Sequence, residues 1–163
     1  MTTKKLYIAT SLRNIPRYNE VKTHFEQKGV IITYDWSVHG QVYTHDELRR
    51  YGIEEEKGVI EAHVFLIIFP GRNGAHYEMG MARILGTPIV ILEEQEVEQK
   101  TFYHVPGLYK TRNLQDADLC VMTLLDYYDK VGRLLPHHDG QGPWNPTRRT
   151  THNVQSISRF LNQ

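Results

Sequence analysis

The stretch that decides the fold is Val64–Leu92, VFLIIFPGRNGAHYEMGMARILGTPIVIL. Its first run, Val64–Phe69, is apolar throughout, which is typical of a central parallel strand that is covered on both faces. Helical spacing follows over His76–Leu85, and Gly86 marks a helix stop before a second apolar run, Ile89–Leu92. The stretch therefore predicts a βαβ unit.

Glu78 is the acid on the inward side of the helix in this unit. It shares a face with Ala82 and Leu85, so it should point toward the sheet and the crevice beside the loop Gly71–Tyr77, where α/β proteins bind ligands. An acid near a helix N-terminus is favoured by the macrodipole alone, so a purely structural role is one interpretation. The other is a nucleophilic or charge-stabilising carboxylate that the helix N-terminus keeps ionised, with Gly74 leaving room for a ligand.

The composition favours one globular domain with no strong electrostatic preference. The 163 residues are 40% hydrophobic, enough for one domain with a proper core. Lys+Arg and Asp+Glu number 19 each, so no global charge favours nucleic acid or a membrane as a partner. No apolar run reaches the ~18 residues of a membrane span, and the single cysteine excludes an internal disulfide. We expect a cytoplasmic protein with one domain over residues 1–135 and a C-terminal extension over 136–163.

Polar side chains follow the first two predicted strands, 5–10 and 30–34. Ser11, Arg13 and Asn14 stand between the first strand and a helix, which is the chemistry that a phosphate requires; an ordinary helix cap with a solvated arginine is an equal alternative. After the second strand, Asp35 and Trp36 either line a base or sugar pocket or form a turn and a core aromatic.

A second inward acid is predicted on the helix that follows Thr44. Thr44 and Glu47 form a capping-box pattern, T-x-x-E. Glu55 falls on the predicted inward face, whereas Glu54 and Glu56 diverge to either side of it. The other residues on that face are Leu48, Gly52, Val59 and Ala62. A charge on such a face is costly unless it is paired or functional, so Glu55 is a better site candidate than its two neighbours.

No metal or cofactor is expected. His137, His138 and Asp139 are adjacent in sequence, but neighbouring histidines do not ligate one ion comfortably from regular structure, and no other histidine or cysteine has ligand spacing to them.

These residues together resemble the nucleoside 2-deoxyribosyltransferase-like superfamily, which includes transferases and deoxynucleoside-monophosphate N-glycosidases. The resemblance rests on Tyr7, on Glu55 and on the pattern G-x-x-Y-E-x-G-x-A from Gly74 to Ala82, which G-x-P-I-V-I-L follows. It covers roughly residues 4–130 and implies a flavodoxin-like three-layer α/β/α sandwich with about five parallel strands.

The resemblance also assigns roles. It implies that Glu78 is the nucleophile that attacks the anomeric carbon, that Glu55 assists departure of the base, and that Tyr7 orients the nucleophile. In the nucleotide hydrolases of this group the first loop binds the 5′-phosphate, which places Ser11, Arg13 and Asn14 there. Arg72 stands where members usually carry aspartate or serine, and it either favours an anionic ligand such as a nucleotide or points to solvent.

The expected partner is therefore a small-molecule nucleoside or nucleotide. The resemblance also implies a homo-oligomer, because members commonly complete each site from a neighbouring subunit. Transfer and hydrolysis are both open, since either a second base or water can intercept the sugar. Two alternatives remain: a TIR-like NAD or ADP-ribosyl glycohydrolase, and a non-catalytic nucleotide-binding or sensing module, which Arg72 and His63 in place of the usual residues suggest.

Overall fold

The computed structural model describes residues 3–40, 44–105 and 107–131. In this part of the chain, five strands form one parallel sheet in the order β2-β1-β3-β4-β5. They are β1 (Lys5–Ala9), β2 (Ile31–Ile32), β3 (Val64–Ile68), β4 (Ile89–Leu92) and β5 (Leu108–Thr111). The predicted α/β class and parallel five-stranded sheet are confirmed, although β2 pairs over only 2 residues of the strand predicted at 30–34.

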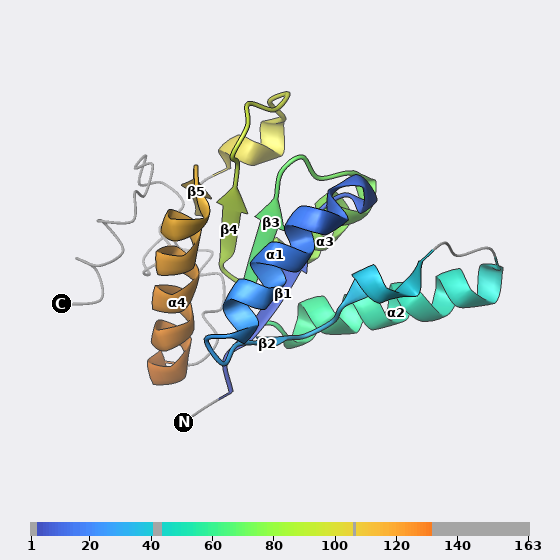
Figure 1. Ribbon diagram of the computed structural model, residues 1–163, viewed down its shortest axis with the longest axis horizontal. Coiled ribbons are helices and arrows are strands. Elements are labelled where there is room, and N and C mark those ends of the chain that lie inside the picture. Colours follow the sequence, from blue (N-terminus) through green and yellow to red (C-terminus); the bar gives the residue numbers. More distant parts are fainter. Residues whose placement is uncertain (1–2, 41–43, 106, 132–163) are drawn as a thin grey trace.

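Helices cover both faces of this sheet (Figure 1). They are α1 (Ile15–Glu26), α2 (His45–Glu61), α3 (Asn73–Ile84) and α4 (Leu114–Val131), with 3-10 turns η1 (Leu12–Asn14), η2 (Trp36–His39) and η3 (Thr101–His104). Helices α1 and α4 share one face, where Asp118 of α4 bonds to His24 of α1 at 3.0 Å and to Lys28, just after α1, at 2.6 Å. Helices α2 and α3 lie on the other face. This is the flavodoxin-like three-layer sandwich predicted from the sequence, with its topological switch point between β1 and β3.

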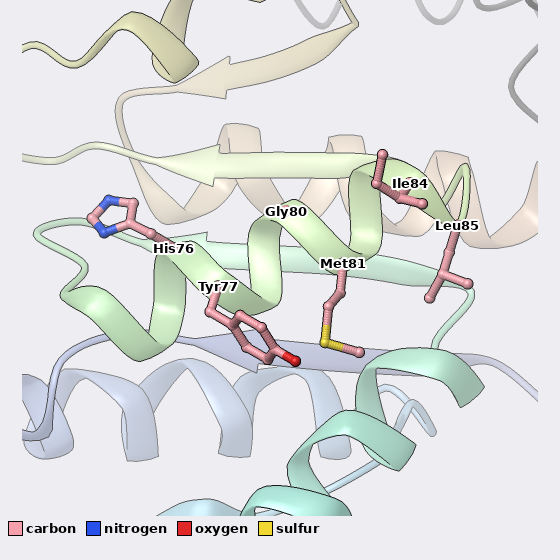
Figure 2. A pocket seen from close by; sticks show the side chains of 6 residues that line it. All are labelled: His76, Tyr77, Gly80, Met81, Ile84 and Leu85. Atoms are coloured by element: carbon pink, nitrogen blue, oxygen red, sulfur yellow. The ribbon is translucent and has the colours of Figure 1, made fainter.

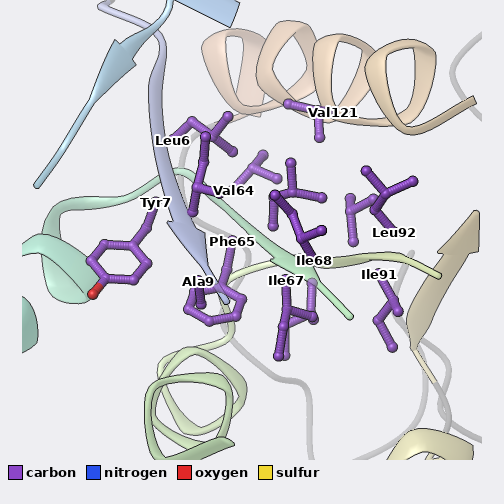
Figure 3. Close-up of a cluster of buried hydrophobic side chains, with 14 of the residues drawn as sticks. Leu6, Tyr7, Ala9, Val64, Phe65, Ile67, Ile68, Ile91, Leu92 and Val121 are labelled. Atoms are coloured by element: carbon purple, nitrogen blue, oxygen red, sulfur yellow. The ribbon is translucent and has the colours of Figure 1, made fainter. Parts of the chain in front are cut away.

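Side chains of the central strands point alternately to the two faces of the sheet (Figure 3). Leu6, Val64 and Leu92 point toward Val121 of α4, whereas Tyr7 and Phe65 point to the opposite side. The Tyr7 and Phe65 rings stack with centroids 5.6 Å apart and an angle of 7° between their planes. Because Tyr7 packs on this ring, its hydroxyl is directed from β1 toward the side of the sheet that carries α2 and α3.

Helix α3 begins at Asn73, earlier than the sequence predicted. The segment Gly71–Tyr77, expected to be a ligand-binding loop, is therefore mostly helix. Glu78 consequently lies in the second turn, and the first turn of α3 holds no acid. The early start escaped the sequence pattern because Arg72, at the N-cap position, makes no capping hydrogen bond with its side chain.

Helix α2 has the predicted start and most of the predicted phase. Thr44 Oγ1 accepts a bond from the Glu47 amide at 3.2 Å, and the Glu47 carboxylate accepts one from the Thr44 amide at 3.2 Å, which confirms the capping box. Val59 is fully buried, but Leu48 is 55% exposed. The prediction was wrong for Leu48 because the N-terminal half of α2 projects beyond the sheet (Figure 1).

Gly58 lets α2 approach the sheet. A Cβ atom at Gly58 would lie 2.7 Å from the Cβ of Tyr34 and 3.0 Å from a ring carbon of Tyr7. We expect Gly58→Ala to lower the free energy of unfolding by about 1–3 kcal/mol, because the added methyl forces α2 away from Tyr34 and Tyr7. Urea unfolding measures this. In the same helix Gly52 has no heavy atom within 4 Å of such a Cβ, so Gly52→Ala should raise the free energy of unfolding by about 0.5–1 kcal/mol. A Gly58→Ala protein as stable as the wild type would contradict the close packing.

Some sequence predictions lie outside the described residues. These include the boundary at residue 135, the extension over 136–163, and the histidine pair with Asp139. Among the helices that the structure describes, none has the length and apolar character needed to cross a membrane.

Candidate active site

A buried acid and a buried phenol meet between β1 and α3. The Tyr7 hydroxyl donates a 2.7 Å hydrogen bond to Oε1 of Glu78. Glu78 is 8% exposed and Tyr7 is fully buried. Each was singled out from the sequence, and the structure brings the two together across 71 residues of chain.

Burial controls the ionisation of Glu78. It raises the pKa of this carboxyl to about 7, and the negative charge of Glu55 acts in the same direction, whereas the Tyr7 hydrogen bond opposes them. The sequence-based expectation that the helix N-terminus keeps Glu78 ionised is not met. The helix dipole acts mainly over the first turn, and Glu78 lies beyond it. Glu78 thus keeps its proton to a higher pH than an exposed glutamate does.

Glu55 lies beside this pair on α2. It is half-buried, and burial raises its pKa above the usual range. Its charge also helps to raise the pKa values of Glu78 and Tyr7, so the three groups lie within electrostatic reach of one another. The structure thus gathers Tyr7, Glu55 and Glu78, and their catalytic roles stay predictions.

The first loop joins the carboxyl ends of β1 and β3. Thr10 Oγ1 donates to the carbonyl of Ile68 at 2.8 Å, and the Asn14 side chain donates to Thr10 Oγ1 at 3.2 Å. Asn14 is therefore engaged in holding the loop. Ser11 is 5% exposed and stands at the N-cap of η1 without a capping hydrogen bond from its side chain, and Arg13 is exposed. Within the described residues, the side chains of Ser11 and Arg13 make no hydrogen bond, and their role in binding a phosphate stays a prediction.

Asp35 and Trp36 have internal partners. The Trp36 indole donates to the carbonyl of Ile8 at 2.9 Å and packs on Tyr18 with ring centroids 4.6 Å apart. Asp35 caps η2 through the Ser37 amide at 3.1 Å and pairs with Lys22 at 2.6 Å. Burial disfavours the Asp35 charge, but these partners outweigh it and lower the pKa. These contacts agree with the second interpretation from sequence, in which Asp35 forms a turn and Trp36 is a core aromatic.

Arg72 and Gly74 stand at the amino end of α3, after the carboxyl end of β3. Arg72 is exposed. Gly74 is exposed too, and a Cβ there would meet no atom within 4 Å. Packing therefore does not require a glycine at this position, and the space beside it is open.

Two tyrosines that the sequence analysis missed bind the neighbours of Glu55. The Tyr34 hydroxyl donates to Glu54 at 2.9 Å, and the Tyr77 hydroxyl donates to Glu56 at 2.6 Å. No local pattern reveals these bonds, because their partners are 20 and 21 residues apart. Glu54, which diverges from the inward face, is thus engaged rather than free in solvent.

Solved structures resemble this fold, whereas the sequence matches no family model and no curated protein. The structure of a CMP N-glycosidase from Clostridium botulinum, BcmB, superposes with a TM-score of 0.51 at 16% identity, covering 77% of this chain and 99% of that one. The solution structure of BlsM superposes with a TM-score of 0.56 at 19% identity, covering 83% and 98%. The chain shares their fold. The resemblance noted in the sequence predicted this fold, and an N-glycosidase is among the structural neighbours.

Proposed function

We propose that this protein is an enzyme that cleaves the N-glycosidic bond of a nucleoside 5′-monophosphate. The observation that carries the proposal is the buried Glu78 carboxyl, which accepts a hydrogen bond from Tyr7 of β1 and lies within electrostatic reach of Glu55. Cleavage at an anomeric carbon needs a carboxylate to trap or stabilise the sugar cation and an acid to help the base depart. The fold shared with a CMP N-glycosidase supports the same chemistry.

The proposed reaction has two steps. Ionised Glu78 attacks C1′ of the sugar, and the C1′–N bond breaks with its electron pair going to the base, which takes a proton from Glu55. Water then attacks C1′ of the glycosyl-enzyme, gives its proton to Glu55 and releases Glu78 as a carboxylate. Burial raises the pKa of Glu55, and this direction favours a role as proton donor to the base.

A 5′-phosphate fits the polar edge of the site. Ser11 and Arg13 follow β1, and Arg72 follows β3, so all three stand at the carboxyl ends of neighbouring strands. A guanidinium group binds phosphate through two parallel hydrogen bonds. We therefore propose that the substrate is a nucleotide rather than a nucleoside. Arg72, which stands where the superfamily that the sequence resembles usually has aspartate or serine, favours this choice.

Incubation with CMP, dCMP, other nucleoside monophosphates, cytidine and NAD, with chromatography of the products, tests the proposal. We expect free base from at least one monophosphate and much slower release from cytidine, which lacks the phosphate. Added adenine that becomes incorporated into a new nucleotide would show transfer instead of hydrolysis. Nicotinamide release from NAD alone would favour the TIR-like alternative. Nucleotide binding without turnover, unchanged in Glu78→Gln, would show a non-catalytic module.

We also propose that the protein is a homo-oligomer that associates through the outer face of α2 and α3. This face exposes Ile53, Tyr77 and Ile84 at 59%, 59% and 81%. A groove of about 570 Å³ lies along α3, and Figure 2 shows Tyr77 and Met81 directed from it toward α2. Exposed apolar side chains beside an apolar groove are typical of a protein interface, and a two-fold contact can bury the same face of two copies.

We expect Ile84→Glu to convert the oligomer to a monomer, because it places a charge in the centre of the apolar contact. Size-exclusion chromatography with light scattering measures the mass. Phe102, which is 71% exposed on η3, offers the matched control. Phe102→Glu should leave the mass unchanged. A wild-type protein that is already monomeric at micromolar concentration would refute the interface.

A further inference from the structure

Both sequence neighbours of Glu55 are held by tyrosine hydroxyls from different elements. Tyr34 follows β2 and donates to Glu54 at 2.9 Å. Tyr77, the residue before Glu78 in α3, donates to Glu56 at 2.6 Å. Helix α2 is thus joined through Glu54 to the segment that follows β2, and through Glu56 to α3.

The Tyr34 contact is the more extensive one. Its hydroxyl also lies 2.5 Å from Nε2 of His39, and because its single hydrogen goes to Glu54, the His39 nitrogen is the donor in this second bond. The His39 ring stacks on Tyr51 of α2 with centroids 3.9 Å apart. Gly58 then brings the α2 backbone against Tyr34. The Tyr77 contact is simpler, since Tyr77 is 59% exposed.

Glu55 itself makes no hydrogen bond in the part of the chain that the structure describes. Its position therefore depends on where the α2 backbone lies. The N-terminal half of α2 projects beyond the sheet (Figure 1), and Glu55 lies just C-terminal to it, before the close contact of Gly58 with Tyr7 and Tyr34. Hydrogen bonds on either side of Glu55 are well placed to fix both the rotation of α2 and its distance from α3.

We propose that Tyr34 and Tyr77 are positioning residues that set the distance between Glu55 and Glu78. Neither needs to touch the substrate, because each acts through a carboxylate adjacent to Glu55. The effect on turnover rests on the proposed function, whereas the effect on the geometry of the two acids does not. Two separate measurements therefore distinguish a failure of this inference from a failure of the proposed function.

The first measurement requires no substrate. Carbon-13 NMR of the carboxyl groups follows the titration of Glu78 in the wild type, in Glu55→Gln and in the double variant Tyr34→Phe/Tyr77→Phe. Removing the Glu55 charge should lower the Glu78 pKa, because that charge helps to raise it. The double variant lets Glu55 move away, so its Glu78 pKa should shift in the same direction. Two results would overturn the inference. One is a Glu78 pKa that falls in Glu55→Gln but stays unchanged in the double variant. The other is a Glu78 pKa that does not fall in Glu55→Gln.

The second measurement is steady-state cleavage of CMP. We expect Tyr34→Phe to lower kcat about tenfold and Tyr77→Phe to lower it about threefold, with little change in KM, because a small misplacement of an assisting acid affects the transition state more than substrate binding. Tyr51→Phe is the matched control, since within the described residues its hydroxyl makes one hydrogen bond, accepted from exposed Arg50. Its kcat should not change. Equal kcat losses in all three variants would contradict positioning. If the wild type cleaves no nucleotide, the proposed function fails while the titration still decides the inference.

Discussion

Replacing Glu78 by glutamine should abolish cleavage and, above neutral pH, stabilise the fold. Burial raises the folded-state pKa of this carboxyl from 4.5 to about 7, so between these values the folded protein holds a proton that the unfolded chain releases. Stability therefore falls as pH rises through this window, and the loss is complete above pH 7, where the folded state holds a buried charge. Glutamine carries no charge and its amide oxygen still accepts from Tyr7, so the variant should be more stable by roughly 2–3 kcal/mol at pH 8.

Urea unfolding at pH 4.5 and pH 8 measures this difference, which should nearly vanish at the lower pH. Turnover of the best nucleotide should fall at least about 10³-fold, because the amide cannot attack C1′. Glu61→Gln is the control, since Glu61 lies on the surface of α2 with a 3.5 Å ion pair to Lys5, and both quantities should stay near the wild-type values. A Glu78→Gln protein with near wild-type turnover would exclude Glu78 as the nucleophile. If the wild type and Glu78→Gln were equally stable at pH 8, burial would not raise the pKa of Glu78.

The parts of the site that follow from local periodicity could be predicted from sequence. The apolar run of β3 and the helical spacing after it indicated that Glu78 faces the sheet, and the phase of α2 separated Glu55 from its neighbours. These patterns repeat within a few residues, so they require no knowledge of the rest of the chain. The inward direction of both acids was therefore predictable.

Properties that depend on distant parts of the chain were not predictable. Leu48 is exposed because α2 extends beyond the edge of the sheet. A short stretch of sequence does not show where the sheet ends relative to the helix. The Glu78 pKa combines burial, Glu55 and Tyr7, which come from three elements. The roles of Asp35 and Trp36 could not be decided from sequence for the same reason. The partner of Asp35 is Lys22, 13 residues earlier, and the partner of Trp36 is Ile8, 28 residues earlier.

The second large effect concerns the pH dependence of kcat/KM. If Glu78 must be ionised to attack, kcat/KM should rise with pH through about 7, the pKa of this carboxyl. Tyr7→Phe removes the hydrogen bond that lowers this pKa, so the rise should move to higher pH. The Tyr7 pKa is itself raised, chiefly by burial and then by Glu78, so its hydroxyl remains a donor over the whole range. The loss of activity in Tyr7→Phe should therefore be larger at pH 6 than at pH 8.

Glu55→Gln should move the same rise in the opposite direction. It removes the negative charge that helps to raise the Glu78 pKa, so Glu78 ionises at lower pH, even though kcat falls by about 10²–10⁴ when the assisting acid is lost. Because the two acids interact, the midpoint in the wild type belongs to the pair, and the direction of each shift is the informative quantity. Profiles of kcat/KM between pH 5 and 9 for both variants, with Glu61→Gln as control, measure these shifts. Two variants that shift the rise in the same direction would show that an ionisation other than that of Glu78 limits the reaction.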